Sequence, residues 1–183
     1  MLERLVKSLE ASPIVKRGEY NYFINPITDG VPSIDPGLLR EIAAAMVKVL
    51  NLDGVTMIVA AEAMGIHIGT ALSLATDIPL NIVRKRQYWL PGEIAVHQCT
   101  GYSKGELYLN GISKGDRVVV IDDVISTGGT IRAVLQCLSQ AGAEVVDVCF
   151  VIQRGHANIG RPFTALVTVD VNEGRVRVLD RYL

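Results

Sequence analysis

The chain has 183 residues, of which 49% are hydrophobic and 20% charged, and its formal net charge is −1. This is the composition of an ordinary globular protein, and it excludes a bulk electrostatic attraction to nucleic acid or to a membrane surface. The apolar runs stop well short of a membrane span, and the charged start MLERLVKSLE has no signal-peptide core, so we expect a cytoplasmic protein without a membrane partner.

The first fifty residues predict two helices around an irregular segment. Apolar residues recur at helical spacing from Leu2 to Leu9, and Ser12-Pro13 ends that pattern. Residues 18–32 are rich in aromatic residues, Gly, Pro and Asn. They predict either a loop or edge hairpin anchored by its aromatics, or a lid whose ring stacks on a flat base. A second helix follows, with Asp35 as its cap and Pro36 in its first turn.

Strands and helices alternate in the next part of the chain. Residues 57–61 and 80–83 are predicted strands, with a helix over 66–74 between them, and 118–121 form another strand. This alternation predicts a parallel sheet with helices on both faces. Ligands bind beyond the carboxyl ends of the strands in such sheets. Charged residues stand at these ends, namely Glu62, Arg84-Lys85-Arg86 and Asp122-Asp123.

Two of these strand ends are suited to anions. Small residues in the turn 60–65 would let backbone amides face an anion, although a plain strand-to-helix turn is nearly as good an interpretation. The run Arg84-Lys85-Arg86 is either a solvated basic turn or a group that binds pyrophosphate oxygens.

The most informative stretch is VVVIDDVISTGGT, residues 118–130. It predicts a buried strand, an acidic pair, a hydroxyl- and glycine-rich loop, and the start of a helix. Amides at a helix start are unpaired and the helix dipole is positive there, so a phosphate fits, with hydroxyl donors from the loop. The two carboxylates suit a pair of sugar hydroxyls or a hydrated metal ion. A ribose 5-phosphate would satisfy both halves, whereas the alternative is an ordinary turn without a ligand.

The last third of the chain completes the predicted sheet. After a helix that Gly142 ends, residues 145–152 form a strand that leads to Gln153. Residues 166–171 and 175–179 then predict a hairpin.

The stretch VVVIDDVISTGGT resembles the phosphoribosyl-pyrophosphate (PRPP) signature of type I phosphoribosyltransferases. Arg84-Lys85-Arg86 followed by Leu90-Pro91-Gly92 is similar to the adenine branch, while AEAMG and HQCTGYSKGELY most resemble an archaeal hypoxanthine/guanine group. The resemblance implies an α/β fold with a parallel central sheet flanked by helices, formed by one domain over residues 1–183. It also implies a small N-terminal hood, residues 1–34, and a flexible loop over the active site, residues 86–105.

The same resemblance implies the activity and the site. The enzyme would transfer 5-phosphoribosyl from PRPP to hypoxanthine or guanine, giving IMP or GMP, with Mg²⁺ bound through PRPP and no direct metal ligand in the chain. It also implies a homodimer. Asp122 and Asp123 would be the catalytic pair at the ribose, and Phe23 and Gln153 would bind the purine. The 5-phosphate would lie on Ser126, Thr127, Gly128, Gly129 and Thr130, and the pyrophosphate on Ala61, Glu62, Ala63, Arg84, Lys85 and Arg86.

Two alternatives stay open at this point. The adenine-like run favours AMP formation, but Met64 stands where adenine-specific members carry an arginine. Proteins of this fold also include regulators that bind PRPP and control nucleic acid, a function that the near-neutral net charge does not favour.

Overall fold

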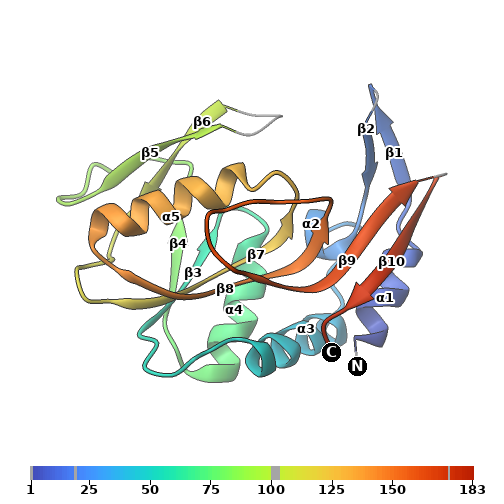
Figure 1. The fold of residues 1–183 in the computed structure, drawn as a ribbon, viewed down its shortest axis with the longest axis horizontal. Coiled ribbons are helices and arrows are strands. Elements are labelled where there is room, and N and C mark those ends of the chain that lie inside the picture. The colour runs from blue at the N-terminus through green and yellow to red at the C-terminus, as the bar shows by residue number, and fades with distance from the viewer. Residues whose placement is uncertain (1, 19, 100–103, 173) are drawn as a thin grey trace.

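A computed structural model describes residues 2–18, 20–99, 104–172 and 174–183. Its centre is a six-stranded sheet in the order β10-β9-β8-β7-β3-β4, in which only β10 at the edge is antiparallel (Figure 1). The predicted parallel sheet and the C-terminal hairpin are therefore confirmed. The strands are β3 (Met57–Ala61), β4 (Leu80–Val83), β7 (Arg117–Ile125), β8 (Glu144–Arg154), β9 (Thr164–Asn172) and β10 (Arg175–Arg181).

Helices cover both faces of this sheet, as the alternating pattern predicts. α3 (Pro36–Val49) and α4 (Gly65–Thr76) pack into one apolar layer, and α5 (Gly129–Ala141) packs into the other. The cap of α3 forms as expected, because the Leu38 amide donates to Asp35 Oδ1 at 2.8 Å. At the start of β7 and β8, Arg117 forms an ion pair with Glu144.

The N-terminal segment is a small layer of its own beside β9 and β10 (Figure 1). It consists of α1 (Glu3–Glu10), the antiparallel hairpin β1 (Ile14–Arg17) and β2 (Tyr20–Phe23), and the short α2 (Pro26–Asp29). The hairpin is one of the alternatives that the aromatic-rich segment left open. Buried Asn25 fixes the segment, since its side-chain amide donates to the Ser8 and Ser12 hydroxyls and its oxygen accepts from the Ile27 amide.

The flexible loop over residues 86–105 stays a prediction, although part of this range has regular structure. Residues Ile94–Cys99 (β5) and Lys104–Leu109 (β6) form an antiparallel ribbon, and among the described residues of this range 86–93 lie outside regular strands. The reason is the apolar alternation of this part of the chain, because buried Val96, Leu107 and Leu109 pack in the layer that holds α5. Residues 100–103, which include the predicted loop glycine Gly101, lie outside the described residues.

The acidic pair also lies differently from the expectation that the strand stops at it. β7 continues through Asp122 and Asp123 to Ile125, because the long β8 gives it a partner as far as Gln153. The strand end therefore carries the carboxylates on a paired, rigid backbone.

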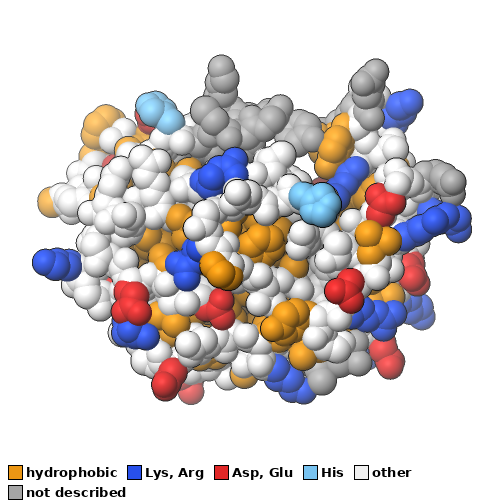
Figure 2. Space-filling view, viewed as in Figure 1, with side chains coloured by type: hydrophobic (Ala, Val, Ile, Leu, Met, Phe, Trp, Pro, Cys, Tyr) orange, Lys and Arg blue, Asp and Glu red, His pale blue; other side chains and the backbone are white. Residues whose placement is uncertain are grey.

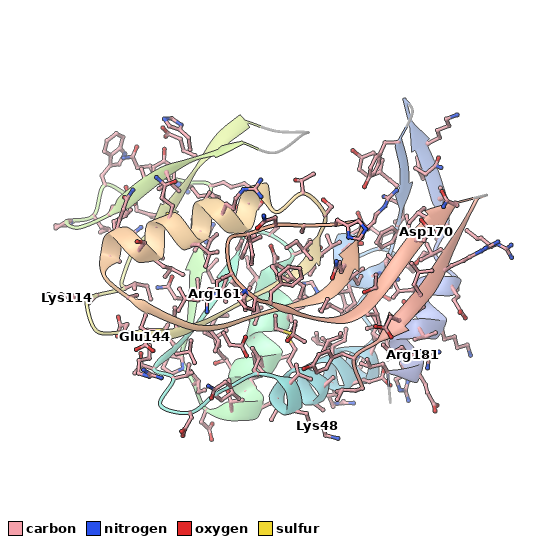
Figure 3. All side chains as sticks on the ribbon, in the orientation of Figure 1. Lys48, Lys114, Glu144, Arg161, Asp170 and Arg181 are labelled. Atoms are coloured by element: carbon pink, nitrogen blue, oxygen red, sulfur yellow. The ribbon has the colours of Figure 1, made fainter. Side chains whose placement is uncertain are left out.

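The surface gives no large area of one charge in the view of Figure 2, where Lys, Arg, Asp and Glu side chains are interspersed. Figure 3 labels charged side chains at both ends of the sheet, Lys114 and Glu144 at one and Asp170 and Arg181 at the other. Among the described residues, none of the helices has both the length and the apolar character needed to cross a membrane.

Candidate active site

A cavity of about 290 Å³ lies at the carboxyl ends of β3 and β7, and we call it the carboxylate cavity. Most of the residues that the sequence singled out converge there from three separate stretches of the chain. They are Glu62 and Ala63 after β3, Lys85 after β4, Asp122 and Asp123 in β7, and the continuous run from Ser126 to Thr130. Buried Ala61 is the last residue of β3 and is not part of the lining.

Two helices begin at this cavity without a side-chain cap. α5 starts at Gly129 and α4 at Gly65, and neither Gly128 nor Met64 at their caps supplies a side-chain hydrogen bond. Amides at the first turn of a helix have no partner within it, and the helix dipole makes that end positive. The cavity therefore presents two neighbouring sites for anionic groups.

Glycine is required at Gly128 for two reasons. Its φ is 76°, in the left-handed region that other residues rarely adopt, and a Cβ there would lie 2.8 Å from Ile159 Cγ2. Behind this turn, Arg132 Nη1 donates to the Thr127 carbonyl at 2.9 Å and to the Asn158 carbonyl at 2.7 Å. The loop Ser126–Thr130 is thus fixed to the segment after β8.

Of the carboxyl pair, Asp123 is buried and Asp122 is half-buried, and the two interact. Burial raises the pKa of Asp122 to about 6, against hydrogen bonds from Asp123 and the positive charge of Lys85, which lower it. Burial and then the neighbouring charge of Asp122 raise the pKa of Asp123 well above its usual value. A Cβ at Gly65 would lie 3.0 Å from Asp122 Oδ1, so this glycine lets α4 begin directly beside the pair.

The three cations after β4 have different places. Only Lys85 lines the carboxylate cavity. Arg84 Nε donates to Glu62 Oε2 at 2.6 Å, and its backbone pairs with Tyr108 of β6. The guanidinium of Arg86 lies over the Tyr88 ring, 5.7 Å from its centroid.

Glu62 holds the residues after β4 in place. It accepts from Arg84 and, at 3.1 Å, from the Lys85 amide. Burial acts to raise its pKa, but these hydrogen bonds and the two positive charges together lower it. The ionised Glu62 therefore links the ends of β3 and β4 through these hydrogen bonds, and it holds Lys85 at the cavity.

A second cavity of about 240 Å³ adjoins the first, and we call it the hood cavity. Asp123, Val124 and Ser126 line both, so the two cavities share one wall. Its other lining comes from the N-terminal segment and from the end of β8, namely Tyr20, Tyr22, Phe23, Thr28, Asp29 and Arg154.

The two predicted base-binding residues have different places. Phe23 lines the hood cavity, although it is only 8% exposed and also packs in the core. Gln153 is not part of that lining, and its side-chain amide donates to the Gly155 carbonyl at 3.0 Å. The next residue, Arg154, lines the cavity instead, with its guanidinium 4.1 Å from the centroid of the Tyr20 ring.

Sequence reasoning missed Thr28, Asp29, Arg154 and Arg132. Alternation of side chains along a strand could have identified Arg154 as soon as Gln153 was considered. For Thr28 and Asp29 there was no such signal, because only tertiary packing of the N-terminal segment brings them to the site.

Comparison with known proteins agrees with this geometry. A model of the phosphoribosyl transferase domain matches residues 33–178. A hypoxanthine/guanine phosphoribosyltransferase of Methanosphaerula palustris is 67% identical over 182 residues and covers all of both chains. The protein of the same name from Methanocaldococcus jannaschii is 56% identical over 181 residues, 96% of this chain and 99% of its own.

Solved structures have the same fold at lower identity. The adenine phosphoribosyltransferase of Trypanosoma brucei, in complex with AMP, pyrophosphate and ribose 5-phosphate, superposes with a TM-score of 0.73 at 22% identity, covering 97% of this chain and 85% of its own. The enzyme of the same name from Thermoanaerobacter pseudethanolicus gives 0.67 at 19% identity, with 88% and 98% covered. The resemblance seen in the sequence is confirmed, and the chain belongs to the phosphoribosyltransferase family.

Proposed function

We propose that the protein transfers the 5-phosphoribosyl group of PRPP to hypoxanthine or guanine, giving IMP or GMP and pyrophosphate. The observation that carries this proposal is the carboxylate cavity, where two helix starts without side-chain caps flank the carboxyl pair of Asp122 and Asp123. PRPP has a phosphate group at each end of a ribose, which matches this order of sites. The relatives from Methanosphaerula and Methanocaldococcus, named for hypoxanthine and guanine, support the choice of base.

Each group of residues has a role in this proposal. The amides and hydroxyls of Ser126–Thr130 hold the 5-phosphate and so fix the sugar. Ala63 and the start of α4 bind the pyrophosphate, and Lys85 supplies a positive charge beside it. Glu62 positions Arg84 at the same turn. Asp122 and Asp123 accept hydrogen bonds from the ribose hydroxyls and stabilise positive charge that develops at the sugar carbon.

Magnesium enters the proposal through PRPP. Within the part of the chain that the structure describes, no cluster of three or more His, Cys, Asp or Glu side chains could hold a metal ion. The oxygens of Asp122 and Asp123 suit Mg²⁺ through its water shell, so the chain fits a metal that arrives with its phosphate ligands. When bound, the ion neutralises charge on the departing pyrophosphate.

The first experiment is a PRPP and Mg²⁺ assay with hypoxanthine, guanine and adenine, in which nucleotide products are separated and measured. We expect IMP and GMP, with little AMP. AMP alone would replace this proposal with adenine salvage. No nucleotide from any base, together with salt-sensitive retention on nucleic acid that depends on PRPP, would replace it with the regulator.

We also propose a homodimer that forms through a groove between α3 and α4. The groove has a volume of about 960 Å³, and its lining is mostly apolar, including Leu39, Ala43 and Ala71. Leu74 on α4 is 80% exposed there. Exposed apolar surface of this extent is typical of an interaction site, and Ala63 and Met64 line both the groove and the carboxylate cavity.

Sedimentation velocity tests the dimer. Leu74→Lys should dissociate it, whereas Leu179→Lys on β10, also at an exposed leucine, should not. A wild-type monomer at working concentration would contradict the proposal. The cytoplasmic location stays a prediction that cell fractionation can test.

A further inference from the structure

We propose that Asp29 and Arg154 select the purine, with Asp29 accepting from N1–H and the 2-amino group and Arg154 donating to the 6-oxo group. This inference rests on the proposed function and deepens it. Both side chains line the hood cavity, together with three aromatic side chains of the hairpin and with Asp123, which also lines the carboxylate cavity. A base in the hood cavity is therefore next to the sugar to which it must be joined.

The aromatic lining makes the cavity suitable for a flat ring. Tyr20 and Tyr22 lie with their ring centroids 4.5 Å apart, and Phe23 continues the same strand. Aromatic faces pair with the π-face of any base, so this part of the cavity recognises a base without selecting one. Selection must come from the polar groups of the lining.

Arg154 supplies donors only. Its guanidinium is held against the Tyr20 ring at 4.1 Å, a contact that fixes its plane without using its N–H groups. Among the residues that the structure describes, Arg154 has no hydrogen bond or ion pair from its side chain. Its N–H groups can form hydrogen bonds only with acceptors of a bound base. The 6-oxo group is such an acceptor on the six-membered ring of hypoxanthine and of guanine.

The side chain of Asp29, when ionised, supplies hydrogen-bond acceptors and no donor. Its Oδ2 accepts from the Asn25 amide at 2.9 Å and from the Thr28 hydroxyl at 2.5 Å, which holds the side chain in place. Within the described part of the chain, Oδ1 has no such partner. A carboxylate faces donors, and guanine offers two adjacent ones, N1–H and the 2-amino group, while hypoxanthine offers N1–H alone.

The pair also excludes adenine. Adenine has an amino group where the 6-oxopurines have an oxygen, so Arg154 would meet a donor, and its N1 is an acceptor that would face the Asp29 carboxylate. Polar groups that lose their partners on binding are costly, and sites that depend on such groups reject the wrong analogue strongly.

The test is a comparison of kcat/KM for guanine, hypoxanthine and adenine in wild type, Asp29→Asn and Arg154→Met. Asp29→Asn should lower the guanine value about 10- to 100-fold and the hypoxanthine value less, so that the guanine-to-hypoxanthine ratio falls. Arg154→Met should lower both 6-oxopurine values and raise the relative rate with adenine, and Arg154→Lys should restore part of the loss. Asp53→Asn, at an exposed turn residue after α3, is the matched control and should leave all three unchanged.

The outcomes separate the two proposals. Because the ratio is measured within one preparation, partial unfolding of a variant does not alter it. If wild type forms IMP and GMP but the guanine-to-hypoxanthine ratio is unchanged in Asp29→Asn, this inference is overturned and the proposed function stands. An equal loss with all three bases in either variant would assign that residue a structural role and overturn its part in selection. A wild-type enzyme that forms only AMP would overturn both proposals.

Discussion

The carboxylate cavity and the hood cavity share a wall but are built in different ways. Most of the carboxylate cavity comes from one continuous run, Asp122 to Ile131, on a central strand and the helix after it. The hood cavity combines a hairpin and a short helix near the N-terminus with the end of β8. The N-terminal residues of its lining are therefore more than a hundred positions from Arg154 in the chain.

We infer from this difference that PRPP binding and base selection lie in different parts of the molecule. The loop Ser126–Thr130 is our proposed 5-phosphate site, and we call it the phosphate loop. It is fixed by local geometry and by the paired strand before it, so its spacing is visible in the sequence. The N-terminal segment is a small layer beside the sheet, so we expect that its polar groups can change without disturbing the phosphate loop. In our proposal, the binding of PRPP and the choice of the base are thus placed on separate structural units.

The largest effect should come from the carboxyl pair. Asp122→Asn combined with Asp123→Asn should leave the fold intact and lower kcat/KM for IMP formation by about 10²–10³-fold or more, because stabilisation of charge at the sugar is lost. Steady-state assays and circular dichroism measure the two properties. Activity near that of wild type in a folded double variant would remove the pair from the mechanism.

The next effect should come from the phosphate loop. Gly128→Ala forces a left-handed alanine and places its Cβ against Ile159, so the KM for PRPP should rise at least 10-fold and the free energy of unfolding should fall by about 1–3 kcal/mol. Gly160→Ala is the control, since Gly160 has a φ of 78° with nothing within 4 Å of an added Cβ. Equal PRPP affinity in both variants would show that the close approach to Ile159 is unimportant.

A smaller effect should follow from removing the side chain that fixes the phosphate loop to the segment after β8. Arg132→Met removes the donors to the Thr127 and Asn158 carbonyls, so we expect about a 10-fold rise in the KM for PRPP with little change in base preference. Arg181→Met, at an exposed residue of β10, is the matched control. If base preference changed as much as PRPP affinity, the two cavities would not be the separate units described above.

The smallest effect concerns stability. The pKa of Asp122 is raised from 3.8 to about 6, so the folded protein binds more protons than the unfolded chain between those values. The free energy of unfolding therefore falls as pH rises through that window and stays lower above it. Asn does not titrate, so the Tm difference between Asp122→Asn and wild type should be more positive at pH 7.5 than at pH 4, by roughly 2–8 °C. A difference that is independent of pH would contradict this assignment of the pKa.

The sequence predicts the carboxylate cavity better than it predicts the hood cavity. The strand, carboxylates and glycine loop of residues 118–130 were identified because neighbours in the chain are neighbours in the cavity. The predicted end of β7 was wrong, because strand pairing with β8 decides it. The strand β5 was not predicted, because its formation depends on burial against α5. Asp29 carries no local signal of function, since its place depends on the packing of α2 and Asn25.

The wall of Asp123, Val124 and Ser126 between the cavities has a consequence for inhibition. Two molecules that bind on either side of this wall lose translational freedom separately, whereas one molecule that spans it loses that freedom once. A nucleoside phosphonate with a purine at one end and an anion at the other would need no spacer to reach both. Such a compound would gain most of its affinity from geometry that the fold already supplies.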